Sequence, residues 1–449
     1  MCLTMMGKSE RRQELLDLTK RSTAAQFERT FRSLNPQLII HQAQLLRPEH
    51  ECTLYLPNDW TSLQEDKQLY NQINIHVPLD FGDGTKWMVR VRQAHVDRPP
   101  KVILDKVTES EVTTTKVLKK GGVKVPDAWM PPLTSKADWD KTTSDKDVAD
   151  YFFTEFIRGE AWLNHHAPLT EGHISEDVAR TLIQGIALLH DTISRIDLKV
   201  KGIGSLFPSD SSSTDSYTLG PFISSSTLIN PDPPYFLGPF RTNQERYLTH
   251  LDLLLGLIYD GVIWTDDPVG AYLWHLEMKD LVQGDEEMGS VEEKCFVKHA
   301  DDKLSQYMLS KDGHVEGLID WEWAYVTTKS EAFATPLGLY HSVSFYNGSN
   351  TLTVEENLLI QAHETNNRPD LAHCVRNGRR YQRLKDAMRY DRPEGIRLGT
   401  INALREAFLG KEAGTGYESL FEWGNVVMDK YREDQKVHDL LKREAMMSK

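Results

Sequence analysis

VKHADDKLSQYMLSKDGHVEGLIDWEWA, residues 297–324, is the stretch of sequence that decides the fold. It combines a polar loop, a short apolar strand, a Lys-Asp-Gly-His turn and a second apolar strand that ends on Asp320. Since the two strands are predicted to form a hairpin, Asp301 of the loop and Asp320 of the second strand can face one nucleotide-bound magnesium ion. The pattern is typical of a phosphotransferase active site.

Five residues of this stretch suit the needs of phosphoryl transfer. The reaction needs a carboxylate that orients the acceptor and takes its proton, and Asp301 is predicted to be this base. Asp320 is predicted to be a magnesium ligand. Gln306 lies where a loop of the form H-x-D-x-x-x-x-N has its asparagine, which predicts a second ligand. His299 is expected to brace the loop, and Lys303 completes the catalytic set. The alternative is an ordinary acidic loop, because an H-x-D triplet alone is common.

The bulk composition predicts a soluble, intracellular protein of two or three packed units. The chain has 449 residues, of which 39% are hydrophobic and 26% are charged, and no apolar run is long enough to span a membrane. Its start lacks the pattern of a secretory signal, and its four cysteines are scattered, so we expect a cytoplasmic location. A formal charge of −14 argues against a nucleic-acid partner.

The order of strand and helix patterns predicts an α+β protein. We expect a helical extension at 1–50, a small lobe with an antiparallel sheet and one helix at 51–157, and a larger, mainly helical lobe at 158–449. Strands are expected at 53–56, 73–79, 86–91, 123–129 and 151–157, with a Gly82-Asp83-Gly84 hairpin turn. Helices are expected at 9–34, 102–120, 175–190, 243–262 and 418–445. The acceptor is expected near a Ser-, Pro- and Gly-rich insert at 208–240.

A cation in the middle of an apolar strand needs a partner, and Arg90 in Trp87–Arg92 is such a cation. We expect Arg90 to contact the α and β phosphates of a nucleotide and to pair with Glu111 on the following helix, with Glu109 as the alternative. If Arg90 instead lies at a sheet edge, its charge points to water.

Several motifs together resemble the aminoglycoside phosphotransferase and choline kinase-like superfamily, and within it a group of fungal proteins. The motifs are W-x-x-R at Trp87–Arg90, Ser110-Glu111-Val112, Val125-Pro126, Gly204-Ser205-Leu206, H-A-D-D-K at His299–Lys303, I-D-W-E-W-A at Ile319–Ala324 and Glu331-Ala332-Phe333. The resemblance runs from about residue 45 to the C-terminus. It implies a bilobal, protein-kinase-like fold that binds ATP and Mg²⁺ and phosphorylates a small molecule. The hinge that meets the adenine would include Glu155, Phe156 and Ile157.

Two departures from the family pattern leave a second hypothesis open. The first hairpin lacks the usual glycines, since the matching stretch is Leu69–Asn74, and Leu304-Ser305-Gln306 replaces the usual residues after the catalytic loop. The chain could therefore be a pseudokinase that binds nucleotide without turnover. The acceptor class is also open: the acidic stretches 285–287 and 292–293 could attract a cationic substrate or could be solvated loops.

Overall fold

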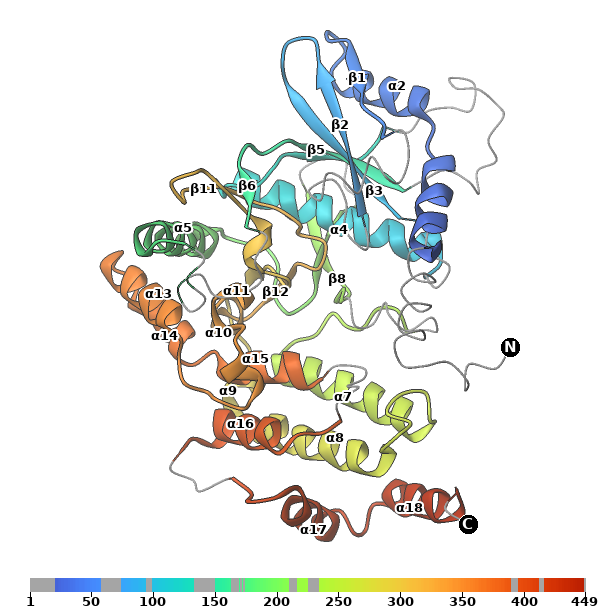
Figure 1. Ribbon diagram of the computed structural model, residues 1–449, viewed down its shortest axis with the longest axis vertical. Coiled ribbons are helices and arrows are strands. Elements are labelled where there is room, and N and C mark those ends of the chain that lie inside the picture. The colour runs from blue at the N-terminus through green and yellow to red at the C-terminus, as the bar shows by residue number, and fades with distance from the viewer. Residues whose placement is uncertain are drawn as a thin grey trace, which may run out of the picture. The chain divides into compact units, whose positions relative to one another are not determined.

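The computed structural model describes residues 21–57, 74–93, 99–132, 150–162, 169, 172, 174–209, 216–224, 234–388, 395–411 and 416–447. The chain divides into two compact units (Figure 1). The sheet unit is Met1–Lys116 with Pro126–Ile157, and the helical unit is Val117–Val125 with Arg158–Lys449. The predicted α+β class is confirmed, with an antiparallel sheet in the N-terminal part and mainly helices in the remainder.

The sheet unit is built on a five-stranded antiparallel sheet of order β1-β2-β3-β5-β4. Its strands are β1 (Cys52–Leu54), β2 (Asn74–Phe81), β3 (Lys86–Arg92), β4 (Ala128–Trp129) and β5 (Tyr151–Glu155), and its helices include α2 (Pro36–Leu46) and most of α4 (Lys101–Lys120). The predicted turn between β2 and β3 is present. The Asp83 carboxylate accepts a hydrogen bond from the Thr85 N–H at 3.0 Å, and Gly84 has a φ of 87°, which favours glycine.

The core of the sheet unit lies on the face that packs against the N-terminal helices. Trp87 stacks on Trp129 with ring centroids 4.2 Å apart, and Val89 and Val91 are fully buried. From the predicted helix 9–34, residues 21–32 are described and helical, and Phe27 is buried in this core. The residues before 21 lie outside the described part. The N-terminal helical extension therefore closes one face of the sheet.

The predicted strand 123–129 is wrong over its first half, because this segment belongs to the core of the helical unit. Gly122 ends α4 with a φ of 81°. Val123 and Val125 then pack in the same apolar cluster as Leu118. The Lys124 C=O accepts a hydrogen bond from the Leu318 N–H at 2.9 Å. Only the last two residues, in β4, pair with the sheet.

In its described residues, the helical unit contains three small sheets among many helices. Its strands are β6 (Glu160–Ala161), β7 (Ser205–Pro208), β8 (Tyr217–Gly220), β9 (Phe296–Lys298), β10 (Tyr307–Leu309), β11 (Val315–Leu318) and β12 (Tyr325–Thr327). The helices before residue 300 are α5 (Glu176–Arg195), α7 (Asn243–Tyr259), α8 (Pro268–Gln283) and α9 (Glu286–Gly289). Those after it are the 3₁₀ turn η2 (Leu304–Gln306), α10 (Lys329–Ala332), α11 (Leu337–Tyr340), α12 (Val343–Tyr346), α13 (Val354–Thr365), α14 (Pro369–Arg376), α15 (Arg379–Ala387), α16 (Leu398–Leu409), α17 (Leu420–Lys430) and α18 (Gln435–Met447). The β7–β8 hairpin forms part of the insert predicted at 208–240.

Three predicted helices differ from the observed ones, and the one predicted at 243–262 already ends at Tyr259. The Ser175 side chain caps α5 as expected, but the helix continues past His190 to Arg195. The pattern at 418–445 forms two helices, because Asp434 starts a new one by accepting hydrogen bonds from the N–H groups of Lys436 and Val437 at 2.9 and 3.1 Å.

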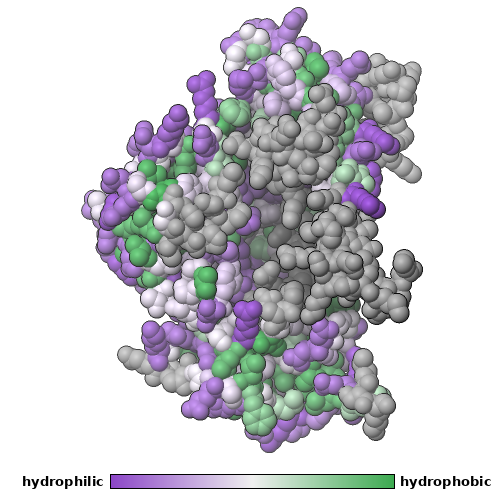
Figure 2. Space-filling view, in the orientation of Figure 1, coloured by the Kyte–Doolittle hydropathy of each residue, from purple (hydrophilic) through white to green (hydrophobic). Residues whose placement is uncertain are grey.

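Helix α17 buries one face and exposes the other. Trp423 and Val427, one turn apart, are buried, whereas Leu420 and Phe421 are exposed. Figure 2 shows apolar surface in the region where α17 lies in Figure 1.

Candidate active site

Two strand pairings in the helical unit bring the predicted catalytic loops together. Strand β10 pairs with β11, with Tyr307 opposite Leu318, and β9 pairs with β12, with Lys298 opposite Tyr325. The loop 299–306 connects β9 to β10, and the loop 319–324 connects β11 to β12. Because each loop runs between the same two ladders, the loops must lie side by side. The hairpin predicted around the Lys-Asp-Gly-His turn is confirmed.

His299 joins the two loops by hydrogen bonds from both ring nitrogens. Its Nδ1 accepts from the Asp301 N–H at 3.2 Å, and its Nε2 donates to the Ile319 C=O at 2.9 Å. This pattern fits the neutral ring with the proton on Nε2. The ring lies 4.6 Å from Trp321, centroid to centroid, and is buried. His299 therefore fixes the backbone on both sides of the candidate site, which is the bracing position expected of it.

Asp320 and Gln306 are in direct contact. The Gln306 Nε2 donates to Asp320 Oδ2 at 3.0 Å, and the Ile319 N–H donates to the Gln306 C=O at 3.0 Å. Asp320 has a φ of 68°, in the left-handed region that few residues other than glycine, asparagine and aspartate adopt. Such strained backbone is concentrated at functional sites. The two predicted metal ligands are thus neighbours; their role as ligands stays a prediction.

The two adjacent aspartates of the loop have different surroundings. Asp301 is half-buried, and its Oδ2 lies 3.0 Å from the Lys303 ammonium. Asp302 is buried, and its Oδ1 accepts from the Leu337 N–H at 2.9 Å at the start of α11. Asp302 is therefore committed to holding α11. Of the two carboxylates, that of Asp301 contacts only the Lys303 ammonium among the described groups and can exchange it for a substrate.

In the sheet unit, Arg90 pairs with Glu111 as the sequence predicts. The Arg90 guanidinium lies 3.5 Å from Glu111 Oε1, and both side chains are buried, with 6% and 4% of their surface exposed. The alternative partner, Glu109, instead pairs with Lys106 at 2.7 Å. Arg90 is therefore held inside the sheet unit, and the edge-strand alternative does not apply.

The predicted hinge residues lie at the end of β5 and just after it, and their backbone groups differ in hydrogen bonding. The Glu155 N–H donates to the Asp127 C=O at 2.8 Å, and the Phe156 N–H donates to the Lys86 C=O at 3.1 Å. Among the described residues, we find no hydrogen bond to the backbone of Ile157. If this segment meets adenine, Ile157 is the residue with backbone groups to offer.

Sequence reasoning missed Lys385, although its side chain reaches the catalytic loop. Its ammonium donates to the C=O of Ala300, the residue before Asp301. Lys385 lies on α15, about eighty residues beyond the loop, so no local sequence signal linked the two.

The acidic stretches that could attract a cationic substrate are bound in part by nearby groups. Arg380 lies 2.7 Å from a carboxylate oxygen of Asp285 and 2.7 Å from one of Glu287. Glu292 accepts a hydrogen bond from the Lys329 N–H at 3.0 Å. These contacts argue against the cationic-substrate interpretation, and the stretch 285–287 is not a solvated loop, because Asp285 caps α9 and its side chain is only 7% exposed.

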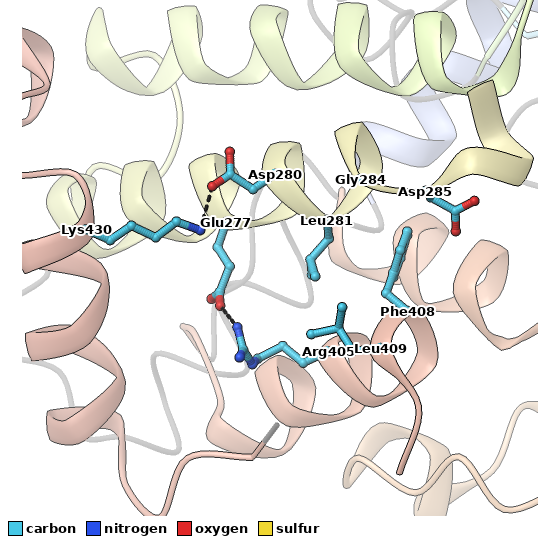
Figure 3. Close-up of a pocket in the computed structure, with 9 residues that line it drawn as sticks. All are labelled: Glu277, Asp280, Leu281, Gly284, Asp285, Arg405, Phe408, Leu409 and Lys430. Atoms are coloured by element: carbon cyan, nitrogen blue, oxygen red, sulfur yellow. Dashed lines mark hydrogen bonds and ion pairs between the residues drawn. The ribbon is translucent and has the colours of Figure 1, made fainter. Parts of the chain in front are cut away.

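A cavity of about 330 Å³ lies between α8, α16 and α17 and contains none of the predicted site residues (Figure 3). Its acidic groups are already paired. Glu277 pairs with Arg405 and accepts from the Trp423 indole N–H at 2.7 Å, and Asp280 lies 2.6 Å from the Lys430 ammonium. We therefore place the candidate chemistry at the two loops and treat this cavity as a gap between packed helices.

The described part of the chain has neither a preformed metal-binding cluster nor a membrane-spanning helix. Within it, no group of three or more His, Cys, Asp or Glu side chains could hold a metal ion by itself. Magnesium bound with a nucleotide needs only one or two protein ligands, since phosphates and water supply the others. No described helix is long and apolar enough to cross a membrane.

No protein-family model matches the sequence, and no curated protein matches it. The structure is similar to several solved kinases and phosphotransferases. An ethanolamine kinase of Plasmodium vivax is 11% identical, with 95% of this chain and 95% of that chain covered and a TM-score of 0.45. An ADP-bound aminoglycoside phosphotransferase, APH(2'')-Ib, is 10% identical over 84% of this chain and 99% of its own, with a TM-score of 0.42. A putative fructosamine-3-kinase of Thermobifida fusca is 14% identical over 75% and 91%, with a TM-score of 0.39. These TM-scores and identities assign neither a family nor a reaction to the chain.

Proposed function

We propose that this protein is an ATP- and Mg²⁺-dependent phosphotransferase that transfers the γ-phosphate of ATP to a hydroxyl or amine of a small molecule. The observation that carries the proposal is the His299 bridge, which ties the loop bearing Asp301 to the loop bearing Asp320. A base and a metal ligand on two loops locked together are what phosphoryl transfer needs. The proposal includes membership of the aminoglycoside phosphotransferase and choline kinase-like superfamily and its fungal group.

The residues present fit a magnesium site. Asp320 offers carboxylate oxygens and Gln306 an amide oxygen, and hard oxygen donors are what magnesium binds. When bound, the ion would neutralise charge on the β and γ phosphates. The left-handed backbone at Asp320 and its contact with Gln306 hold the carboxylate in one orientation before any ligand arrives.

The remaining groups have roles that follow from their positions. Asp301 orients the acceptor and takes its proton at a carboxylate oxygen. Lys303, 3.0 Å from that carboxylate, can move to the transferred phosphoryl group when a substrate displaces it. Arg90, held by Glu111, contacts the α and β phosphates, and the backbone of Ile157 meets the adenine. The three described cysteines, Cys52, Cys295 and Cys374, are free, which suits the reducing cytoplasm we propose as its location.

A pseudokinase is the second candidate, and the Asp301–Lys303 ion pair favours it. A base that is neutralised by its own neighbour is less available to an acceptor. The glycine-poor stretch 69–74 also favours this candidate, although of its residues only Asn74 is described.

The test uses the full chain with ATP and Mg²⁺. Binding is measured by calorimetry, and ADP release is measured with and without a library of small alcohols and amines. We expect Asp301→Asn to bind ATP and lose transfer by about 100- to 10,000-fold, the usual contribution of a positioned base. Asp320→Asn should weaken Mg²⁺-dependent ATP binding. ATP binding with the same background ADP release from every variant would leave the pseudokinase, and no ATP binding at all would remove both candidates.

A further inference from the structure

We propose that Lys385 makes the site selective for acceptors that carry an anionic group, a carboxylate or a phosphate, beside the hydroxyl that is phosphorylated. This inference rests on the proposed function and adds the acceptor class to it. It depends on three features of the helical unit: the placement of the Lys385 ammonium, the rigidity of α15 and the charge balance around the catalytic loop.

The Lys385 ammonium lies against the residue next to the proposed base. It donates to the Ala300 C=O, and Ala300 is bonded directly to Asp301. The Lys385 side chain has solvent-exposed surface, so a ligand can reach it, although desolvation by the surrounding protein lowers the pKa of its ammonium. An acceptor whose hydroxyl meets the Asp301 carboxylate therefore places its neighbouring atoms within reach of Lys385.

Helix α15 is held at several points, which fixes the position of the Lys385 backbone. Arg379 makes a two-pronged ion pair with the buried carboxylate of Glu356. Arg380 pairs with Asp285 and Glu287. Arg383 donates to the Phe345 C=O at 2.8 Å and to the Ser349 C=O at 2.6 Å. The other cations of α15 are thus occupied in anchoring the helix, and a site built on such a rigid element positions its ligand well.

Among the described residues, Lys385 is the cation of this cluster that has no carboxylate within ion-pair distance, although Asp302 and Asp301 act on its charge from further away. Lys303 lies 3.0 Å from Asp301, and Lys298 lies 3.9 Å from Asp302, so two lysines match the two acids of the loop. The hydrogen-bond acceptor of Lys385 is a neutral carbonyl, so its ammonium is not held by an acid and can take an anionic ligand.

The Lys385 ammonium determines which acceptors fit. An ammonium is a compact charge with three N–H donors, and it can hold a carboxylate or phosphate oxygen while keeping its bond to Ala300. A cationic acceptor such as an aminoglycoside would meet repulsion at the same place. A neutral alcohol would gain nothing from Lys385. A hydrogen bond to a charged group contributes about 10- to 100-fold in affinity.

The test measures binding and transfer with matched acceptors. The probes are a library of hydroxy acids, each paired with its methyl ester, and of phosphorylated alcohols, each paired with the parent alcohol; amino alcohols supply the cationic arm. Binding to the full chain with ADP and Mg²⁺ is followed by ligand-observed NMR, and transfer is followed as ADP release from ATP. We expect acids or phosphates to be preferred over their neutral partners. The two anionic arms show which of the two groups is recognised.

Substitutions assign the preference to Lys385. Lys385→Met should raise KM for anionic acceptors by about 10- to 100-fold, with a smaller change in kcat, and remove the preference over the neutral partner. Lys385→Arg should restore it in part. Lys311→Met, which removes an exposed lysine from the β10–β11 turn, is the control and should keep the preference.

Four results overturn the inference: preference for esters, parent alcohols or amino alcohols; no binding of any anionic member; a preference that Lys385→Met leaves intact; or a loss confined to KM for ATP, which would assign Lys385 to the nucleotide. The proposed function fails separately. If neutral or cationic acceptors are phosphorylated and Asp301→Asn abolishes this, the phosphotransferase stands and the anionic class is wrong. If ATP does not bind, the phosphotransferase is lost, and the NMR comparison still decides whether Lys385 recognises anions.

Discussion

Acidification should destabilise the helical unit through a buried histidine pair, His190 of α5 and His363 of α13. The His190 Nδ1 and His363 Nε2 lie 3.4 Å apart, and the rings stack with an interplanar angle of 14°. Burial lowers the pKa of His190 well below its usual value, and the neighbouring His363 adds to the effect. Burial, together with the charge of Arg368, lowers the pKa of His363 from 6.5 to about 4. Both rings are therefore neutral in the folded protein at neutral pH.

The size and sign of the effect follow from these shifts. Above pH 6.5 neither state binds the extra proton, so the full stability is present. Below pH 6.5, the two histidines bind protons in the unfolded chain but not in the folded chain. The free energy of unfolding therefore falls by about 1.4 kcal/mol per pH unit for each histidine. For His363 alone, the loss between pH 6.5 and pH 4 amounts to about 3 kcal/mol.

Urea unfolding of the wild type and variants, followed by tryptophan fluorescence between pH 7.5 and 4.5, measures this slope. His363→Gln removes one of the two protons, so its free energy of unfolding should depend less steeply on pH, by about 1.4 kcal/mol per unit below pH 6. His438→Gln, on the exposed face of α18, is the control and should keep the slope of the wild type. Parallel pH profiles for the wild type and His363→Gln would refute the reasoning.

Three further perturbations test other parts of the structure. Arg246→Met leaves the buried Glu331 carboxylate without its cation at 2.7 Å and should cost about 3–5 kcal/mol in urea unfolding, part of which the double change with Glu331→Gln restores. Asp320→Val should cost about 1–2 kcal/mol more than Asp320→Gly in thermal unfolding, because φ is 68° there; equal costs would contradict the left-handed backbone. Arg90→Met should weaken ATP binding in calorimetry by about 10-fold or more, as expected for a lost charged hydrogen bond, whereas Lys86→Met on the exposed part of the same strand should not.

Sequence patterns predicted correctly those elements whose turn or cap residues lie within or next to the element. The Gly82-Asp83-Gly84 turn predicted the β2–β3 hairpin because few residues other than glycine adopt its left-handed position. The Lys-Asp-Gly-His turn at 311–314 predicted the β10–β11 hairpin in the same way. Ser175 predicted the start of α5, since its side chain accepts from the Val178 N–H. These signals are local, because each residue acts on its neighbours along the chain and needs no distant partner.

The wrong strand prediction and the missed contacts depend on partners that are distant in sequence. Val123 and Val125 have the apolar spacing of a strand, but their neighbours in space are in the helical unit, so the segment packs there without pairing. The His190–His363 pair and the contact of Lys385 with Ala300 join residues separated by 173 and 85 positions. No window of sequence contains both members of either contact.

The structure distinguishes Asp301 from Asp302 as the proposed base, which the sequence motif alone does not do. Both aspartates lie in the same H-A-D-D-K loop, and their chemistry is identical. The fold separates them by hydrogen bonding: the Leu337 N–H binds the Asp302 carboxylate, and the Gly338 N–H binds its C=O at 3.3 Å. Replacing the Asp302 side chain would leave the Leu337 N–H at the start of α11 without its acceptor, which is a structural loss. Asp301 has no such duty, and its backbone is fixed by His299 while its carboxylate stays half-exposed. A fixed backbone with an available carboxylate is what a general base requires, and only one of the two positions provides it.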